Sequence, residues 1–292
     1  PLDALLLDFI VGSEIALRAG IALHATAPDY HSSGAWNALG CAALVARCRG
    51  LSAGAVWQAL GIAEYYGPRA QMMRCIDHPT MVKDSSAWGA LTGVSAADLA
   101  EDGFTGAPAV TCIASEIEEL WADLGQTWRI LETNFKAYPV CRWSHPVIEG
   151  VRGLKAQHHI TAEDVTAIEV ATFSEATRLD TRRPADSDAA QYSLPLAAAL
   201  ALTTDDLTPD VLFPSAFDTP ETWRMVDAVG LSEKEAYNQI FPAERLCDVT
   251  LVLRDGTRLE MAGVTGRGNY DLPLTDAELI RKFDLYASPC LS

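Results

Sequence analysis

Apolar residues recur at helical spacing through the N-terminal part of the chain. In the opening stretch, residues 2–24, apolar residues recur too densely for a helix with a single apolar face, which predicts a buried helix. Two further helices are predicted over 34–50 and 52–66, where small residues allow close packing and Ser52 is placed to cap the second. The same helical pattern continues over two later stretches, 81–101 and 115–124.

Near Asn134 the pattern changes to one that is typical of strands. Residues 164–173 and 247–263 are rich in β-branched side chains, and Asp255-Gly256 in the second stretch predicts a hairpin turn. Helical patterns lie between these strands, around 190–203 and 220–229. This region is therefore predicted to be an α+β unit.

The C-terminal tail returns to a helical pattern. Thr275 and Glu278 have the spacing of a capping box and predict the start of a last helix. We therefore predict a mainly α protein with three parts: a multihelical main domain over 1–132, a smaller α+β domain over 133–268, and a segment, 269–292, that returns to the helical domain.

Composition and charge narrow the class of protein. The formal net charge of -17 disfavours nucleic acid and anionic membrane surfaces as partners, because both attract basic proteins. No uninterrupted apolar run is long enough to cross a bilayer. The seven Cys are scattered without a Cys-x-x-Cys pair, a pattern typical of reduced thiols in the cytoplasm. We therefore expect a cytoplasmic protein without a structural zinc site.

The first segment that carries candidate chemistry is 27–40, where His31 lies in a polar loop just before a helix. Backbone N–H groups at a helix N-terminus favour an anion and an uncharged imidazole, which can accept a proton. The alternative is a capping or buried structural histidine.

The second segment, 73–91, places Lys83 beside Ser85 and Ser86 at the entry to a helix of small residues. A lone Lys against an apolar helix indicates an anion site. The alternative is a solvated surface Lys beside Asp84.

The third segment, 134–150, lies at the junction of the two predicted domains, where ligand clefts often form. Lys and Arg can bind carboxylates, and His can transfer a proton. The alternative is a rigid linker with a few surface charges. The candidate residues of this segment are Lys136, Tyr138, Arg142 and His145.

These segments belong to an ordered series of motifs that spans nearly the whole chain. The series includes HSSGAWNALG, MVKDSSAWGA, NFKAYPVCRWSHP, SLPLAAAL and GRGNYDLPLTDAELIRKF. It resembles the MmgE/PrpD family, which includes 2-methylcitrate dehydratase, cis-aconitate decarboxylase and iminodisuccinate epimerase. The resemblance implies a helical main domain, a smaller α+β lid, a homodimer, and an active site between domain and lid that uses no metal or organic cofactor.

The resemblance also implies roles for single residues. By position, His31, Lys83 and Lys136 match residues of the family's active-site segments. The family's reactions each build negative charge on a carboxylate, so cationic groups would stabilise it while His31 removes a carbon-bound proton. The candidates are catalytic residues His31, Lys83, His145 and Tyr138, of which either of the last two would return a proton, and substrate-binding residues Lys136, Arg142, Ser85 and Ser86.

Two positions depart from the family pattern. Ser85 and Ser86 stand where relatives commonly have a His, and Leu196 stands where they commonly have a Tyr. Relatives also begin with a further His- and Asp-rich segment that helps to form the site. We expect a cofactor-independent, dehydratase-type lyase acting on a small di- or tricarboxylate. The alternatives are an epimerase, isomerase or decarboxylase of a related polycarboxylate, and a carboxylate-binding family member without catalysis.

Overall fold

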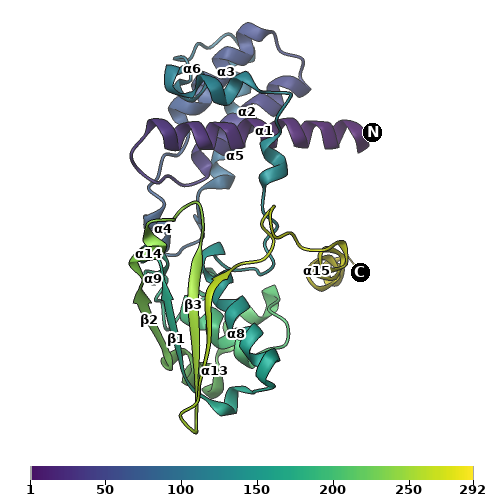
Figure 1. The fold of residues 1–292 in the computed structure, drawn as a ribbon. Helices are drawn as coiled ribbons and strands as arrows, with labels where there is room; N and C mark the ends of the chain where they lie inside the picture. Colours follow the sequence, from purple (N-terminus) through teal and green to yellow (C-terminus); the bar gives the residue numbers. More distant parts are fainter. Residues whose placement is uncertain (1, 292) are drawn as a thin grey trace. The chain divides into compact units, whose positions relative to one another are not determined.

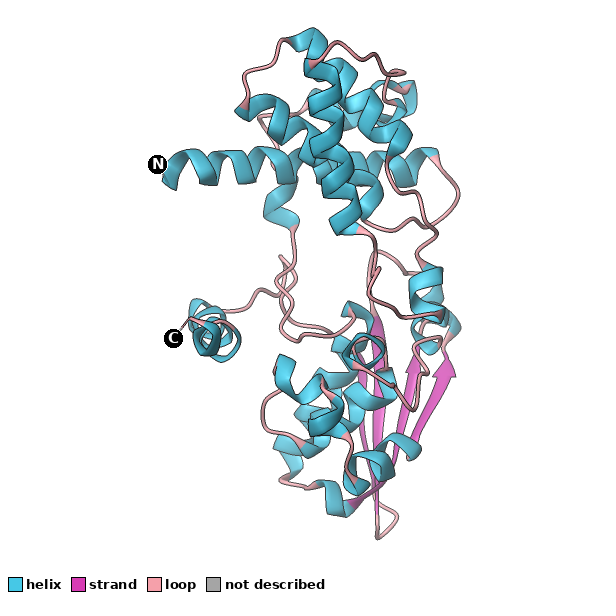
Figure 2. Cartoon of the chain, turned by 180° about the vertical axis from the view of Figure 1, so that it is seen from behind, coloured by secondary structure: helices cyan, strands magenta, loops and turns pink. Residues whose placement is uncertain are grey.

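The computed structural model describes residues 2–291, whose contacts form two compact units that divide between Thr133 and Asn134. The predicted boundary, between 132 and 133, is one position away. Helices make up most of the first unit, and the second contains a four-stranded sheet with helices (Figures 1 and 2). The predicted fold class, mainly α with a smaller α+β part, is confirmed. No helix within residues 2–291 combines the length and apolarity needed to cross a bilayer.

The core of the first unit lies between its long helices, α1, α2, α3 and α5. Helix α2 packs against the other three, and the residues at these contacts are mostly alanines without exposed surface. Small side chains let helix axes approach closely, which is the packing that the sequence pattern predicts. The helices of this unit are α1 (Leu2–Thr26), α2 (Gly34–Cys48), α3 (Ala53–Tyr66), α4 (Met73–Asp77), α5 (Ser86–Glu101), α6 (Val110–Ile113), η1 (Ser115–Ile117), α7 (Glu118–Ala122) and η2 (Arg129–Glu132).

The predicted helix starts agree with the structure in part. Ser52 caps α3 as expected, because its hydroxyl accepts a hydrogen bond from Ala55 N at 3.3 Å. The helix predicted over 81–101 begins only at Ser86, and 81–85 form a turn. Segment 115–124 is divided into a short 3-10 turn and α7.

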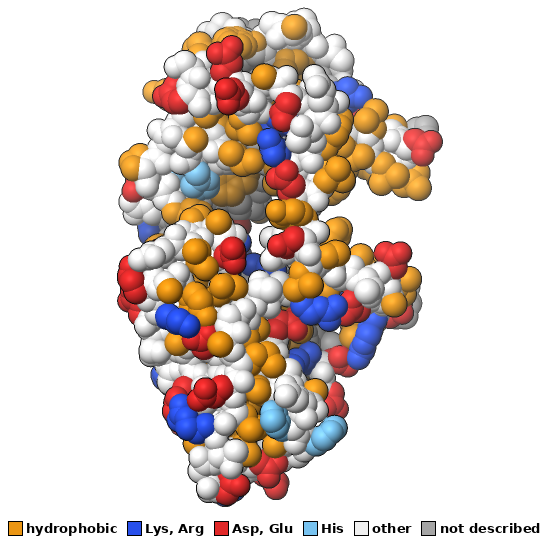
Figure 3. All heavy atoms as spheres, in the orientation of Figure 1, with side chains coloured by type: hydrophobic (Ala, Val, Ile, Leu, Met, Phe, Trp, Pro, Cys, Tyr) orange, Lys and Arg blue, Asp and Glu red, His pale blue; other side chains and the backbone are white. Residues whose placement is uncertain are grey.

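The prediction of a buried first helix is wrong for the N-terminal turns of α1. Its buried residues begin at Gly12, whereas Leu2, Leu5 and Phe9 are more than half exposed. Asp8 pairs with Arg47 near the C-terminal end of α2, so the turns before Asp8 extend past that helix. This half of α1 projects from its unit (Figure 1) and carries hydrophobic side chains along its surface (Figure 3).

Two glycines bring the N-termini of α2 and α5 into direct contact. A Cβ added at Gly89 would lie 2.9 Å from Gly34 Cα and closer still to the carbonyl oxygen of Gly34. Both atoms belong to the backbone, so the helices would have to separate. We expect Gly89→Ala to lower the free energy of unfolding by about 1–3 kcal/mol, measured by urea denaturation.

A matched control lies on α3. A Cβ at Gly54 would meet only Ser52 Oγ, at 3.9 Å, so Gly54→Ala adds helix propensity without a clash. We expect this variant to be as stable as the wild type or slightly more stable. Equal losses in the two alanine variants would contradict the contact between α2 and α5.

The sheet of the second unit has the strand order β2-β1-β3-β4. The predicted hairpin is confirmed: β3 (Leu246–Leu253) and β4 (Arg258–Thr265) pair antiparallel around the Asp255-Gly256 turn. Strand β1 (Val165–Thr172) pairs antiparallel with β3. Strand β2 (Val229–Glu233), which the sequence pattern missed, pairs parallel with β1.

Helices cover one face of this sheet. Helix α8 packs against β3 and β4 and contacts α11, which in turn contacts α13. The other face carries polar pairs such as Arg258 with Glu169, an arrangement typical of a sheet with one solvated face. The helices of the unit are η3 (Arg142–Ser144), α8 (His145–His158), η4 (Ala162–Asp164), α9 (Ser174–Thr177), α10 (Ser187–Ala190), α11 (Leu194–Thr203), η5 (Pro209–Leu212), α12 (Pro214–Phe217), α13 (Pro220–Asp227), α14 (Glu235–Asn238), α15 (Asp276–Tyr286) and η6 (Ser288–Cys290).

The C-terminal helix α15 starts as predicted, with the capping box of Thr275 and Glu278 formed in both directions. Its contacts differ from the predicted return to the helical domain. Arg281 pairs with Asp206 at 2.8 Å, and the Tyr286 hydroxyl donates to the Leu207 carbonyl at 2.9 Å. All these partners belong to the second unit.

Candidate active site

The first and second candidate segments meet where α2 and α5 begin. Gly34 N donates a hydrogen bond to Asp84 O at 3.0 Å, and the hydroxyls of Ser32 and Ser85 are 3.0 Å apart. The contact between Gly34 and Gly89 fixes this junction. Two long helices therefore place their N-termini side by side, and both favour an anion nearby.

A cavity of about 620 Å³ opens at this junction. Three basic side chains line it: Lys83, Arg74 and His78. Among its described lining residues there is no Asp or Glu. In a chain with a net charge of -17, this is a local excess of positive charge, which suits an anionic ligand.

Lys83 and Ser85 both line the cavity, and both have unusual backbone conformations. Their φ angles are 50° and 60°, in the left-handed region that costs non-glycine residues about 1 kcal/mol or more. Hydrogen bonds from Lys83 N to Thr80 O and from Ser85 N to Val82 O hold the turn. Strain of this kind is concentrated at functional sites, and here it presents an enclosed Lys83 Nζ beside the cavity.

His31 lies beside the cavity rather than in its lining. Its neighbour Ser32 and its bridge partner Gln71 both line the cavity, and α2 begins three residues later. The His31 side chain is buried, and its ring atom Nδ1 has no hydrogen-bond partner among residues 2–291. A buried polar atom without a partner costs about 1–3 kcal/mol, so such an atom points to a ligand or water that completes it.

Ser86 is placed differently from the predicted substrate-binding role. Its hydroxyl is within hydrogen-bonding distance of Ser33 Oγ, Asn37 Nδ2 and Asp84 Oδ1, at 3.0, 2.9 and 3.1 Å. It lines a smaller hollow between α1, α2 and α5. The hydrogen-bonding capacity of this hydroxyl is therefore used by other groups of the protein. We assign Ser86 to the contact between α2 and α5.

Sequence reasoning missed two residues of the cavity, Arg74 and His78. They lie four positions apart, Arg74 within the short helix α4 and His78 directly after it, and both line the cavity. The spacing of two basic residues four positions apart was the available signal.

In the second unit, Arg142 connects the third segment to the loop after β4. Its Nη2 donates to Gly266 O at 2.7 Å and to Asn269 Oδ1 at 2.5 Å, and its Nη1 contacts His145 Nδ1 at 2.9 Å. A side chain at Gly266 would collide with Arg142 and His145. Three of the five N–H donors of an arginine are thus used within the protein, which leaves fewer for a carboxylate.

His145 is fully buried at the start of α8, and both ring nitrogens have partners. Arg142 donates to Nδ1, so the proton lies on Nε2, which faces the Val140 carbonyl at 3.4 Å. Burial lowers the His145 pKa to about 3, and the charges of Arg142 and Lys136 act in the same direction. An enclosed neutral imidazole does not suit the predicted return of a proton to the substrate, so we assign His145 a structural role.

This burial predicts a pH dependence of stability. Below the ordinary pKa near 6.5 the unfolded chain binds a proton at His145 that the folded chain does not, so stability falls as the pH drops towards 3. Between pH 6.5 and 5 the loss should be about 1–2 kcal/mol, measured by urea denaturation. His145→Asn should show a shallower dependence, and parallel profiles for the two proteins would contradict it.

Tyr138 retains the features of a proton donor. Its hydroxyl donates to Glu149 Oε1 at 3.1 Å, and its ring packs edge-on against His145 with centroids 5.2 Å apart. Burial, together with the Glu149 carboxylate, raises the Tyr138 pKa to about 12. The phenol is therefore protonated at neutral pH, and it lines a separate cavity of about 220 Å³ in this unit.

The remaining predicted positions are an exposed Lys and a buried Leu. Lys136 donates from Nζ to Val140 O at 3.1 Å, and Lys282 Nζ donates to Lys136 O at 2.6 Å. An ammonium has three donors, so two remain for a ligand. Leu196 is fully buried in α11.

No cluster of three or more His, Cys, Asp or Glu suited to a metal ion occurs in residues 2–291.

Comparison with known proteins identifies both units. The MmgE/PrpD N-terminal domain matches residues 3–114, and the MmgE/PrpD C-terminal domain matches residues 138–292. No curated protein matches the chain. The two domain matches follow each other in order and cover both structural units. The chain therefore belongs to the MmgE/PrpD family.

Proposed function

We propose that this protein is a cofactor-independent lyase that removes a proton next to a carboxylate of a small di- or tricarboxylate. The family is generally enzymatic, with dehydratase-like and isomerase-like members, which supports the reaction class. The observation that carries the proposal is the cationic cavity of the first unit, which lies beside a buried imidazole nitrogen without a partner.

The geometry suits the charge that such a reaction develops. Loss of a proton next to a carboxylate builds negative charge on its oxygens, and fixed cations in an enclosed site stabilise that charge better than water does. Lys83 and Arg74 supply positive charge at the cavity, and the N-termini of α2 and α5 add their dipoles. His31 is the base in this proposal, in the tautomer that carries its proton on Nε2, because Nδ1, which has no hydrogen-bond partner among residues 2–291, can then accept the substrate proton.

In the second unit, Tyr138 rather than His145 retains the capacity to donate a proton, because its phenol keeps its proton at neutral pH. A phenol of high pKa donates its proton readily only to a strongly basic atom, such as a departing hydroxide or a carbanion.

Proton exchange tests the proposal directly. Citrate, 2-methylcitrate, cis-aconitate and small dicarboxylates are incubated with the protein in deuterated buffer, and label is followed by NMR. We expect deuterium incorporation or elimination with at least one compound, and the product identifies dehydration, epimerisation or decarboxylation. Stabilisation against heat without exchange would instead indicate a carboxylate-binding protein without catalysis. Neither effect with any compound would reject the substrate class.

Lys83→Met tests the anion site separately from turnover. Loss of a hydrogen bond to a charged group costs about 1.5–3 kcal/mol, so the Kd of a bound carboxylate should rise by about tenfold or more in calorimetry. Arg49→Met is the matched control, because Arg49 pairs with Asp98 and Glu101 on the surface of the same unit. Equal effects of the two variants would show that only the overall charge matters.

A further inference from the structure

The last turn of α1 carries His24, whose ring has a defined tautomer. His24 Nδ1 lies 2.8 Å from the carbonyl oxygen of Gly20, which can only accept a hydrogen bond. The proton is therefore on Nδ1, and Nε2 has a free lone pair. That nitrogen accepts the backbone N–H of His31 at 3.3 Å.

The backbone N–H of His31 has a special need for this acceptor. On either side of His31, Tyr30 O accepts from Met72 N at 2.7 Å, and Ser32 N donates to Ala70 O at 2.8 Å. Hydrogen-bonding directions alternate along an extended chain, so the His31 N–H points away from that partner segment. Without His24 it would be a donor without a partner in a buried residue.

We propose that His24 is a positioning residue that fixes the backbone of the base His31. The effect on turnover that we expect from this positioning rests on the proposed function, in which His31 is the base. Two aromatic rings orient His24: the ring centroids of Tyr30 and Trp36 each lie 5.2 Å from its own. A Cβ at Gly20 would lie 3.1 Å from the indole of Trp36, so that glycine lets Trp36 approach α1. Nε2 of His24 is the hydrogen-bond acceptor for His31, and the rings of Tyr30 and Trp36 fix the orientation of the His24 imidazole.

Two substitutions separate the acceptor from the rest of the side chain. His24→Leu removes the acceptor, whereas His24→Gln keeps an amide oxygen at a comparable reach. Both residues are good helix formers at a largely exposed position, so α1 should remain intact in either variant. A role in stability alone would affect both variants alike.

The first measurement uses NMR of the full chain labelled with 15N at its six histidines. We expect the His24 ring of the wild type to carry its proton on Nδ1. The His31 amide should lose about tenfold or more of its exchange protection in His24→Leu and keep it in His24→Gln. A proton on Nε2 of His24, or unchanged protection in His24→Leu, would overturn the proposal.

The second measurement is turnover of whichever carboxylate the wild type exchanges. Displacing a reacting group by a fraction of an ångström acts on kcat, so His24→Leu should lower kcat by about tenfold or more with little change in KM. His24→Gln should recover most of it, and equal losses in both variants would overturn the positioning role. If the wild type exchanges no compound, the proposed function fails, while the NMR measurement still decides whether His24 holds His31.

Discussion

Replacing His31 by Gln should lower turnover by about 100-fold or more, because general base catalysis contributes about 10²–10⁴ to rate. Gln has a similar length and polarity but cannot accept a proton at neutral pH. Nδ1 of His31 makes no hydrogen bond within residues 2–291, so the variant loses no protein partner at this atom. The free energy of unfolding should therefore change little, in contrast to the rate.

The measurement is the rate of deuterium incorporation into the carboxylate that the wild type exchanges, with urea denaturation as the test of folding. His158→Gln, at the exposed C-terminal end of α8, is the matched control and should exchange at the wild-type rate. Near-normal exchange by a folded His31→Gln protein would eliminate His31 as the base. A large loss of stability would mean that the residue has a structural role.

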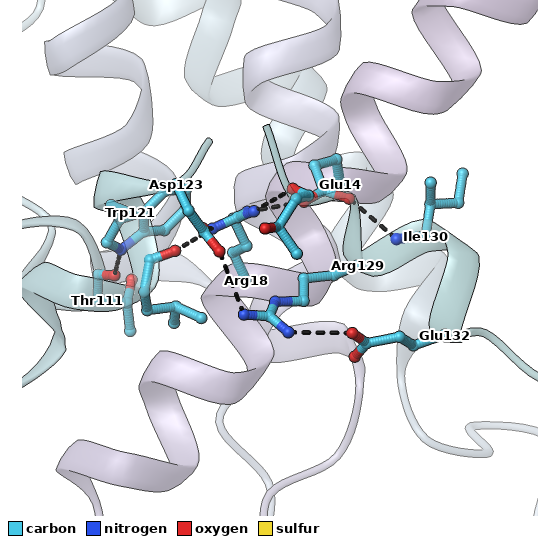
Figure 4. A network of polar contacts seen from close by, with 10 residues as sticks. Glu14, Arg18, Thr111, Trp121, Asp123, Arg129, Ile130 and Glu132 are labelled. Atoms are coloured by element: carbon cyan, nitrogen blue, oxygen red, sulfur yellow. Dashed lines mark hydrogen bonds and ion pairs between the residues drawn. The ribbon is translucent and has the colours of Figure 1, made fainter. Parts of the chain in front are cut away.

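The largest effect on stability is expected at Arg18, whose side chain is fully buried and lies at the centre of a network of polar contacts (Figure 4). It donates to Glu14 at 2.7 Å, to Asp123 at 2.5 Å and to the Thr127 carbonyl at 2.6 Å. It also contacts the carbonyl of Leu120. This one side chain therefore joins α1 to the segment that ends the first unit.

Removing one partner of a buried ion pair leaves the other charge without compensation, which costs about 3–5 kcal/mol. Arg18→Met should lower the free energy of unfolding of the first unit by this amount, because Glu14 is only 1% exposed. Arg47→Met removes a half-exposed partner of Asp8 and should cost about 1 kcal/mol or less. Urea denaturation followed by circular dichroism measures both.

A double variant tests the cause of this loss. Glu14→Gln removes the charge that Arg18→Met would leave unpaired, and the amide oxygen can still accept from Ile130 N. The double variant should therefore be more stable than Arg18→Met alone. If instead the two losses add, the cost comes from lost packing and not from the buried charge.

Features set by a few neighbouring residues agreed between sequence and structure. The Ser52 cap, the capping box of Thr275 and Glu278 and the Asp255-Gly256 hairpin each depend on side chains within a few positions of one another. Such contacts form wherever the local backbone allows them, so the sequence contains the information needed to predict them.

Features that need a distant partner were missed or misplaced. Strand β2 exists because Val229–Glu233 lies beside β1, and its five residues, with apolar side chains only at Val229 and Leu231, are too few to mark a strand. The apolar start of α1 does not indicate burial, because burial depends on whether another helix reaches it. Here the contact with α2 ends near Asp8.

The candidate site divides in the same way. The sequence by itself determined which residue types stand in the three candidate segments, and through them the family and the expectation of an anionic substrate. Only the tertiary structure decided which groups are available. Lys83 and Ser85 line a cavity together with Arg74 and His78, which the sequence pattern did not single out. The hydroxyl of Ser86 instead forms hydrogen bonds within the protein. The tertiary structure also enclosed His145, whose proton affinity depends on burial and on the neighbouring Arg142. Proton affinity and free hydrogen-bonding capacity are set by surroundings that the fold assembles from distant parts of the chain.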